Sequence, residues 1–537
     1  MFVDENYESI EKPHDYCGIA GVISPPGQVA SNIVVEMGKA LQHRGQNGAG
    51  LAVKARGKLL KVFKKARAFN EVFTSTEVID DNFLKGEVAI AHLRYPTEGS
   101  HRRDCDAQPF YASYQGWEIA VGHNGSLVNL NTHRKKLKKF DIELESDSDS
   151  EILAWLIVTS PGLNWKQKIS NALADVQGAY SLIMVTGDDK LIALRDPWGV
   201  RPLVWTQDNG HVFVASETCA LDRIDMRHSK QIEPGQMLMA SADSVSVSTF
   251  VKPEKRSFCV FEKLYFSHET SSWDGIIGEN RESLGEQLAL EEIDRIKHEE
   301  MSKKAFERIE YVIAVPETAS PGAHAFCETL IEKSGKVTKL HYKRGLVKGR
   351  YDYAKRTFIE DDPYLRKRNV EKKFFVSPAI IGKSIYLVDD TAVRLTTYRI
   401  LVEHLLRVGV AEIHCRFLAP KFLNPCFLGV NIGSRDELGA VSTDKYGKYH
   451  ELSEKEITKT LNVSSVHYLS LNGMAKSLGL TTKDLHKSYC TGCLDYNNPF
   501  DMRPYDREFA QTTYLNNFTV KAKKSSKKVI TEIHPQI

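Results

Sequence analysis

The sequence has no apolar run approaching the roughly 18 residues that a membrane-spanning helix needs, and residues 1–16 lack the apolar core of a secretory signal. It also lacks a large excess of either charge: the formal net charge is +3, too small to make nucleic acid the expected partner. With 42% hydrophobic residues and no glycine repeat, the chain is neither collagen-like nor wholly disordered. We therefore expect a globular protein that binds neither membranes nor nucleic acid.

Cysteine is scarce and odd in number: nine residues in a chain of 537 that shows no secretory signal. Such thiols are typical of the reducing cytoplasm, where cysteines serve catalysis or metal binding rather than disulfide bridges. The length exceeds the usual domain size of about 100–200 residues several times. We therefore expect a cytoplasmic protein with two large domains.

Between residue 17 and about residue 264, the sequence contains a series of short apolar runs. These runs are residues 18–23, 87–91, 180–185, 191–194 and 211–215. Few helical stretches interrupt them, one of which is residues 149–158. The pattern predicts stacked β-sheets with helices packed outside.

An alternation of strands and helices follows a charged, helical stretch at residues 281–304. Residues 397–407 have a helical pattern that Gly409 ends. The β-branched runs that predict strands are residues 311–315, 384–388 and 412–418. Strands buried on both faces have this composition, so the second half predicts an α/β domain with a parallel sheet.

Cys17 begins the motif CGIAGVIS and directly follows residues 1–16, a segment of weak structural character. A cysteine with a free α-amino group carries both a nucleophile and a base, because the amine can take the thiol proton. This chemistry requires that residues 1–16 are removed as a propeptide. A buried core cysteine is the alternative interpretation of the same residue.

Polar motifs further along the chain supply the partners that such a thiol needs. Asn124 and Gly125, in GHNGSL, can form an oxyanion hole from a side-chain amide and a backbone N–H. Arg94, in AHLRYPT, can bind an α-carboxylate at two points, and Asp149, in SDSDSEIL, can bind an α-ammonium. Together they suit an amino acid whose side-chain amide is attacked by Cys17.

These segments, in this order, resemble the class II glutamine amidotransferases, which have the N-terminal nucleophile hydrolase fold. The resemblance continues through the motifs LQHRGQNGAG, RDPWGVRPL, ASETCAL and EPGQM. It implies an α+β sandwich of two sheets between layers of helices (αββα), with glutamine as the substrate.

The motif LVDDTAVRLTT, at residues 387–397, predicts a strand, two acids, a tight loop and the start of a helix. Backbone N–H groups and the hydroxyls of Thr396 and Thr397 at such a helix start can hold a phosphate. Asp389 and Asp390 can face ribose hydroxyls, or a magnesium ion that holds them. An ordinary strand-to-helix turn with an acidic cap is the alternative interpretation.

This loop resembles that of the type I phosphoribosyltransferases. Both halves in this order resemble the amidophosphoribosyltransferase family, from Cys17 to about residue 499. The resemblance implies that Lys348 and Arg350, in GLVKGRY, neutralise pyrophosphate on a flap.

Several residues depart from the family pattern, three of them in the phosphate loop and the flap. Leu395 stands where the family has Gly in the phosphate loop, a position at which Gly allows positive φ and close approach of the ligand. Asn369 and Glu371 stand where the flap has Gly and Arg. These departures bear on the acceptor of the nitrogen rather than on glutamine.

Four cysteines point to a metal site: Cys490 and Cys493, which form a CxxC pair, together with Cys259 and Cys426. From the residues alone, a [4Fe–4S] cluster, a structural zinc ion and free thiols all remain open. The iron–sulfur branch of the same family has cysteines in these contexts, which implies a [4Fe–4S] cluster with a structural role. The cysteines expected in the apolar core are Cys105, Cys219, Cys327 and Cys415.

The resemblance implies conversion of phosphoribosyl pyrophosphate and glutamine to 5-phosphoribosylamine, glutamate and pyrophosphate, with Mg²⁺, by a homo-oligomer (a tetramer or dimer). Two alternatives stay open: a glutaminase that serves a different sugar phosphate, and a non-catalytic regulator that retains the fold. The expected divisions are a propeptide (1–16), a glutamine amidotransferase domain (17–264), a phosphoribosyltransferase domain (265–440), a C-terminal segment with cluster cysteines (441–500) and a tail (501–537).

Overall fold

The computed structural model describes residues 17–74, 84–95, 103–146, 148–334, 339–349, 374–430 and 432–506. The expected propeptide, Arg350, Asn369, Glu371 and the side chain of Thr397 lie outside the described residues. Within that described part of the chain, no helix has the length and apolar character needed to cross a membrane.

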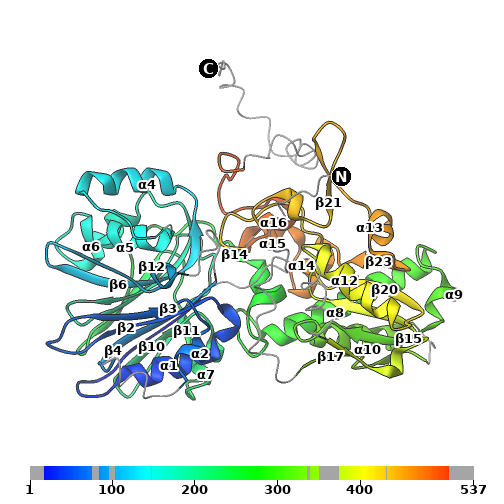
Figure 1. Ribbon diagram of the computed structural model, residues 1–537, viewed down its shortest axis with the longest axis horizontal. Coiled ribbons are helices and arrows are strands. Elements are labelled where there is room, and N and C mark those ends of the chain that lie inside the picture. The colour runs from blue at the N-terminus through cyan, green and yellow to red at the C-terminus, as the bar shows by residue number, and fades with distance from the viewer. Residues whose placement is uncertain are drawn as a thin grey trace.

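Two antiparallel sheets form the first half of the molecule (Figure 1). The seven-stranded sheet has the order β11 (Lys230–Gln231), β9 (Val204–Asp208), β10 (His211–Ala215), β1 (Gly18–Ile23), β4 (Val88–Arg94), β2 (Gly48–Lys54), β3 (Lys61–Lys65). The six-stranded sheet has the order β13 (Val245–Thr249), β12 (Gln236–Ala240), β8 (Leu191–Arg195), β7 (Gly178–Thr186), β6 (Trp117–Leu127), β5 (Phe110–Tyr114).

Alternating side chains of β1 explain how the two sheets stack. Ile19 and Ile23 pack between the sheets, against Ile183 of β7 and its neighbours. Gly21 lies on this same face, where a Cβ atom would come within 2.3 Å of Ile183, so glycine permits the close approach of the sheets. The opposite face of β1 packs against α1 (Ala30–Ala40).

Helices cover the outer face of each sheet, as the run of separated apolar strands predicts. Beside α1 lies α7 (Thr218–Asp222). The six-stranded sheet is covered by α4 (Leu130–Leu137), α5 (Asp149–Thr159) and α6 (Trp165–Leu173), which are seen together in Figure 1. The predicted αββα sandwich is confirmed.

A five-stranded parallel sheet forms the second half. Its order is β16 (His341–Tyr342), β15 (Ile309–Ala314), β19 (Ser384–Asp389), β20 (Glu412–Phe417), β23 (Ser465–Tyr468). One face, with Tyr386 and Val388, packs toward α8 (Ile277–Lys297) and α10 (Ser320–Lys333). The other face packs toward α12 (Leu395–Arg407) and α13 (Glu454–Leu461). The predicted parallel α/β fold is confirmed.

Two boundaries differ from the sequence expectations. The helix expected over residues 281–304 begins earlier, at Ile277, and ends at Lys297, because Glu299 takes a left-handed conformation (φ 61°) that breaks the helix before α9 (Lys303–Phe306). The parallel sheet takes its edge strand β23 from beyond residue 440, so the C-terminal segment contributes to that sheet.

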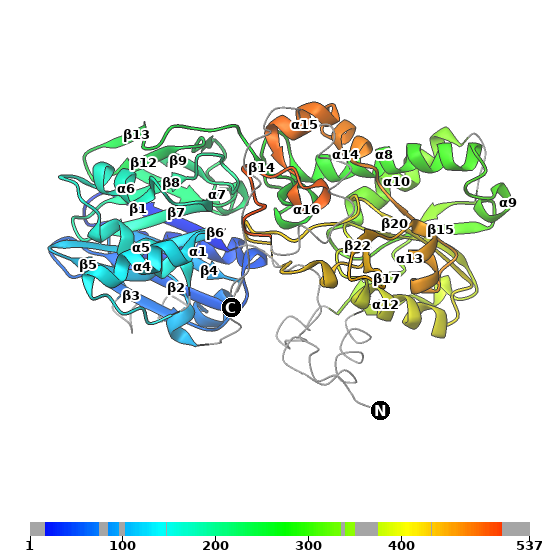
Figure 2. The ribbon, with the colours of Figure 1, turned by 90° about the horizontal axis from the view of Figure 1, so that it is seen from above.

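The end of the C-terminal segment lies between the two halves, where Figures 1 and 2 both place α15 (Thr482–Ser488) and α16 (Gly492–Asp495) beside β14 (Phe258–Cys259). The segment also contains α14 (Leu471–Ser477) and β24 (Tyr489–Cys490). Strand β24 pairs in parallel with β14, and the ring of Phe500 packs 4.7 Å from that of Trp198. The segment therefore contacts both halves of the molecule.

Candidate active sites

Cys17 lies at the start of β1 with only 8% of its surface exposed, and its sulfur lies 3.7 Å from the carbonyl oxygen of Tyr95. Burial raises the pKa of the Cys17 thiol, and the charge of Arg94 opposes this only in part. The thiol is therefore protonated at neutral pH. Attack on an amide requires a base beside the thiol, and the α-amine of an N-terminal Cys17 would meet this need.

Two opposite charges lie close enough to act on this thiol. Arg94 ends β4 and lowers the pKa of Cys17, whereas Asp149 begins α5 and raises it. The Asp149 Oδ2 atom accepts the N–H of Leu127 at 3.1 Å. Burial favours the neutral acid, but His123 outweighs it and lowers the pKa of Asp149. A cation and an anion thus lie within electrostatic reach of the nucleophile, which is compatible with the predicted carboxylate and ammonium sites.

Asn124 and Gly125 lie on β6, in the sheet that faces β1. Gly122, two residues before Asn124 and on the same face of the strand, packs against Ile19 and His92. The Asn124 side chain is fully buried, and its Nδ2 and Oδ1 atoms have no hydrogen-bond partner among the described residues. Gly125 has φ +148°. An oxyanion hole requires a buried hydrogen-bond donor that is available to the substrate oxygen, and the Asn124 amide meets this requirement.

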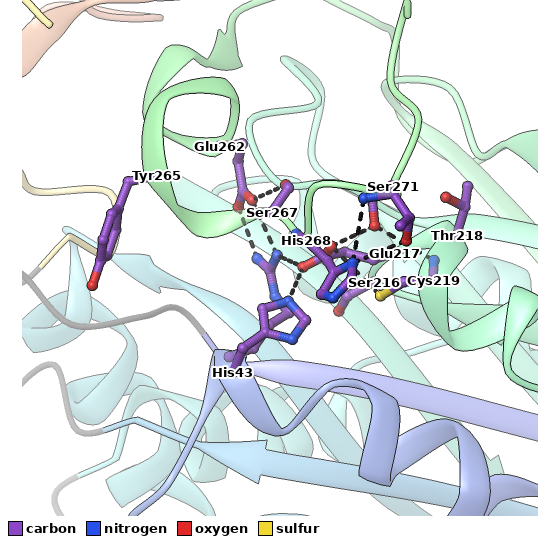
Figure 3. A network of polar contacts seen from close by, with 12 residues as sticks. His43, Ser216, Glu217, Thr218, Cys219, Glu262, Tyr265, Ser267, His268 and Ser271 are labelled. Atoms are coloured by element: carbon purple, nitrogen blue, oxygen red, sulfur yellow. Dashed lines mark hydrogen bonds and ion pairs between the residues drawn. The ribbon is translucent and has the colours of Figure 1, made fainter. Parts of the chain in front are cut away.

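Figure 3 shows a buried network of polar contacts around Glu217 and Glu262. Arg44 donates to the carbonyl of Cys17 at 3.4 Å and pairs with the carboxylates of Glu217 and Glu262. Glu217 also accepts from the Ser271 hydroxyl at 2.6 Å. Arg44 and Glu217 lie in the motifs LQHRGQNGAG and ASETCAL, and the sequence alone predicts no role for either residue. The sequence signal that could have identified these two residues is the presence of a charged residue inside an apolar or glycine-rich motif.

His43, Glu217 and Cys219 bring possible metal-ligand atoms within 4.8 Å of one another. Glu217 is already held by Arg44 and by the backbone N–H of His268 at 2.8 Å. Burial and the Glu217 charge raise the pKa of the Cys219 thiol well above its usual value. These contacts make the group part of the network of polar contacts.

The acidic loop of the second half follows β19, as expected. Asp389 ends this strand, and Asp390 comes next; both side chains are buried. Asp389 accepts the backbone N–H of Asp390 at 2.9 Å, and Asp390 accepts the Thr391 hydroxyl at 2.8 Å. The first turn of α12 begins with Leu395 and half-buried Thr396. The two aspartates, the loop that follows them and the start of α12 thus lie together at the carboxyl edge of the parallel sheet.

Leu395 and Lys348 take different positions around this loop. The Leu395 side chain is 7% exposed and packs in the apolar cluster of α12, against the backbone of Gly439. Arg394, just before it, forms an ion pair with Glu437. Lys348 ends β17 (Leu346–Lys348), and its Nζ atom lies 4.0 Å from the carboxylate of Glu317, beyond β15.

The four candidate ligand cysteines gather from three segments, and none of them forms a disulfide. Cys259 and Cys490 are register partners on β14 and β24, and Cys493 follows on α16. Each of Cys426, Cys490 and Cys493 has a thiol pKa raised chiefly by burial and further by neighbouring cysteines of the set.

The cysteines expected in the apolar core lie mostly there. Cys219, Cys327 and Cys415 are buried, but Cys105 is only half-buried. It lies in the short turn η2 (Asp104–Asp106), where its backbone carbonyl accepts from Lys64 at 2.9 Å.

Comparison with known proteins supports both halves. A family model described as "Glutamine amidotransferase domain" matches residues 97–223. The chain is 35% identical to amidophosphoribosyltransferase 1, chloroplastic, of Arabidopsis thaliana, over 92% of this chain and 80% of that protein. It is 32% identical to the amidophosphoribosyltransferase of Bacillus subtilis, over 91% of this chain and 95% of that protein.

Two solved structures share the architecture of both halves. One is glutamine phosphoribosylpyrophosphate amidotransferase from B. subtilis complexed with ADP and GMP, with a TM-score of 0.76 and 30% identity over 90% of this chain and 98% of that one. The other is described as the allosteric regulatory enzyme of purine biosynthesis, with a TM-score of 0.75 and 31% identity over 89% of this chain and 95% of that one.

Proposed function

This chain belongs to the amidophosphoribosyltransferase family, and we propose that it transfers the amide nitrogen of glutamine to phosphoribosyl pyrophosphate. With one water, the products are 5-phosphoribosylamine, glutamate and pyrophosphate, the first step of de novo purine synthesis. The observation that carries the proposal is the buried amide of Asn124, which has no hydrogen-bond partner among the described residues and lies in a sheet facing Cys17. The Cys17 thiol lies within electrostatic reach of Arg94 and Asp149.

The glutaminase half of the reaction uses these residues in separate roles. The Cys17 sulfur attacks the side-chain amide carbon of glutamine while the α-amine of the same residue takes the thiol proton. Asn124 Nδ2 and the Gly125 N–H donate to the developing oxyanion. Arg94 binds the α-carboxylate, and Asp149 binds the α-ammonium. Ammonia leaves, and water then hydrolyses the thioester to glutamate.

The second half holds the acceptor. The α12 start, with Thr396 and Thr397, cradles the 5-phosphate. Asp389 and Asp390 face the ribose and supply the oxygen donors that Mg²⁺ prefers, an ion that would neutralise pyrophosphate charge.

Leu395 and the two cations of the flap complete this acceptor site. Burial of Leu395 in the core of α12 supports a phosphate loop with room for its ligand. Lys348, together with Arg350, neutralises the leaving pyrophosphate.

The four gathered thiols can hold a [4Fe–4S] cluster or a structural zinc ion. The resemblance to the iron–sulfur branch of the family favours the [4Fe–4S] cluster. Cys259, Cys426, Cys490 and Cys493 would hold it, and it would tie the C-terminal segment to both halves.

The remaining expectations stay predictions: assembly into a homo-oligomer, a cytoplasmic location, and removal of residues 1–16. Sequencing the N-terminus of the purified protein tests the last of these, since a mature chain must begin at Cys17 for the α-amine to act as base.

The test of the function is a product balance on anaerobically purified protein. Supplied with glutamine and phosphoribosyl pyrophosphate, it should release glutamate and pyrophosphate in equal amounts. With glutamine as the nitrogen source, the Cys17→Ala variant should release neither glutamate nor pyrophosphate. With ammonia in place of glutamine, it should again release pyrophosphate. Glutamate without pyrophosphate would identify a glutaminase for another acceptor, and neither product would identify a non-catalytic regulator.

A further inference from the structure

Three hydrogen-bonded side chains lie behind the proposed ammonium-binding site. The Nδ1 atom of His123, on β6, lies 3.0 Å from the hydroxyl of Ser150 and 3.6 Å from Asp149 Oδ1. The Ser150 hydroxyl lies 3.2 Å from the same Oδ1 atom. His123 and Ser150 are buried to 1% exposure or less, and the Asp149 side chain is 15% exposed.

The other ring nitrogen of His123 fixes the tautomer. Nε2 lies 3.3 Å from the carbonyl oxygen of Ala179. A carbonyl can only accept, so Nε2 carries a hydrogen in both charge states of the ring. Neutral His123 therefore presents a bare Nδ1 to Ser150, and protonated His123 presents an N–H there.

Ser150 has one hydroxyl hydrogen to place between two acceptors. When His123 is neutral, Nδ1 accepts that hydrogen, and Asp149 Oδ1 keeps its lone pairs for a ligand. When His123 is protonated, Nδ1 donates to the Ser150 oxygen, and the hydroxyl turns to Asp149. The carboxylate then has a hydrogen bond already made and a cation nearby, both of which weaken its attraction for an ammonium group.

We propose that His123 is a positioning residue for the amino-acid substrate, which acts through Ser150 to control how strongly Asp149 binds the α-ammonium. The proposal rests on the proposed function and deepens its glutamine site. It predicts that protein with a neutral His123 ring binds the amino acid more tightly than protein in which the ring carries a proton. His123 also lies beside Gly125, where an added Cβ atom would be 3.0 Å from Nε2, so the ring is close to both proposed ends of the substrate site.

The groups that face His123 come from several elements. From β4 comes His92, whose Nε2 atom lies 3.0 Å from the His123 carbonyl and whose pKa burial lowers to about 3, so that it stays neutral above pH 5. The backbone N–H of His123 donates to Gln108 at 2.8 Å. Asp149 and Ser150 come from α5, and the Ala179 carbonyl comes from β7. Arg94 also belongs to β4, at its end.

The test is calorimetric binding of L-glutamate, the product that turnover does not consume, between pH 5.5 and 7.5. In the full-length wild-type protein, we expect the Kd to fall roughly tenfold across this range, the size of one charged hydrogen bond gained by the ligand. The ionisable groups of free glutamate change little in this interval. His123→Asn, which keeps a polar atom near the Nδ1 position but cannot titrate, should give a flat profile.

Two further variants separate positioning from mere structural support. Ser150→Ala, which removes the relay but keeps the imidazole charge, should retain only part of the pH response. His92→Asn, the same substitution at a neighbouring buried histidine, should retain the full response even if it lowers stability.

A wild-type Kd that changes less than about twofold, or a His123→Asn profile that still slopes, overturns the inference. Absence of glutamate binding at every pH overturns it as well. If glutamate binds with the expected pH profile but no glutamine is hydrolysed, the inference stands and the proposed function fails.

Discussion

The guanidinium of Arg44 binds the carboxylate of Glu262 at two points, 3.1 and 2.8 Å long, although the two residues are 218 positions apart. Arg44 also donates to the carbonyl of Cys17, and Glu262 begins the single helical turn η4 (Glu262–Phe266) that precedes α8. Both side chains are fully buried. The nucleophile is therefore held partly by a residue outside both sheets, on the connection to the second half.

Replacing Glu262 by Gln should test this link. Removing one charge of a buried pair leaves the other poorly compensated, so we expect the free energy of unfolding to fall by about 3 kcal/mol. Glutaminase activity should fall as well, because the carbonyl of Cys17 is less firmly placed. Denaturant titration and a glutaminase assay measure the two effects.

The matched control for that variant is Glu36→Gln. The Glu36 side chain is 39% exposed and pairs with Lys39 and Arg223 at the surface. Exposed pairs of this kind contribute up to about 1 kcal/mol. Equal losses of stability in the two variants would contradict the role given to Glu262.

Arg94→Lys should separate binding from chemistry at the glutamine site. A guanidinium binds a carboxylate at two points, and an ammonium cannot reproduce this geometry. We expect the KM for glutamine to rise about tenfold while kcat changes far less. Arg103→Lys, at a half-exposed arginine bound to Asp106, is the control and should leave both constants unchanged. A fall in kcat at constant KM would assign Arg94 to the chemical step instead.

His467 should make stability depend on pH. Its ring lies 2.9 Å from Glu454 and 3.3 Å from Glu291, which joins β23 to α13 and α8. Burial alone would lower the pKa of His467, but the hydrogen bonds of the two carboxylates outweigh it and raise the pKa. The stabilisation is thus complete below the unfolded value of about 6.5 and is lost as pH rises through the folded value.

The measurement is the thermal midpoint of wild type and His467→Gln from pH 5.5 to 9. We expect the advantage of wild type to shrink by about 2–4 °C as pH rises, because neutral imidazole no longer attracts both carboxylates. His486→Gln is a control, since His486 contacts one carboxylate, Asp495, at 2.6 Å. An advantage that grows toward alkaline pH would reverse the assigned sign.

Cys490→Ser should remove the proposed cluster. The register partner of Cys490 is Cys259, so losing this thiolate breaks the site where β14 and β24 join. We expect anaerobically purified protein to lose bound iron and acid-labile sulfide and to unfold several degrees lower. Cys327→Ser, at a buried thiol on α10, should keep its bound iron and acid-labile sulfide. Zinc in place of iron in the wild-type protein would support the alternative metal.

The secondary structure of the first half could be predicted because its signals are local. Residues 18–23 and 149–158, read as a strand and a helix, correspond to β1 and α5. The order of the strands could not be predicted, because β1 pairs with β10 and β4, which lie far along the chain. The end of α8 at Lys297 was missed because residues 298–304 continue its charged pattern.

Candidate site residues were predictable where chemistry dictates the residue type. A nucleophile, an amide and paired charges explain why Cys17, Asn124, Arg94 and Asp149 could be chosen from the sequence. Arg44 and Glu262 could not be paired, because their partnership exists only after the chain folds across two hundred residues. For the four cysteines, resemblance to a known family supplied the choice of a [4Fe–4S] cluster, because the residues alone left cluster, zinc and free thiols open.

Leu395→Gly tests whether the departure from the family pattern alters the acceptor site. The Leu395 side chain packs against Gly439, where a Cβ atom would lie 2.3 Å from its Cγ atom, and so contributes to the core. We expect the variant to lose about 3–5 kcal/mol of stability through the cavity and the helix-weakening glycine. Leu405→Gly, at a fully buried site on the same helix, should cost a similar amount. Neither variant should improve kcat/KM for phosphoribosyl pyrophosphate, measured by pyrophosphate release. A gain in Leu395→Gly alone would show that the leucine obstructs the phosphate loop.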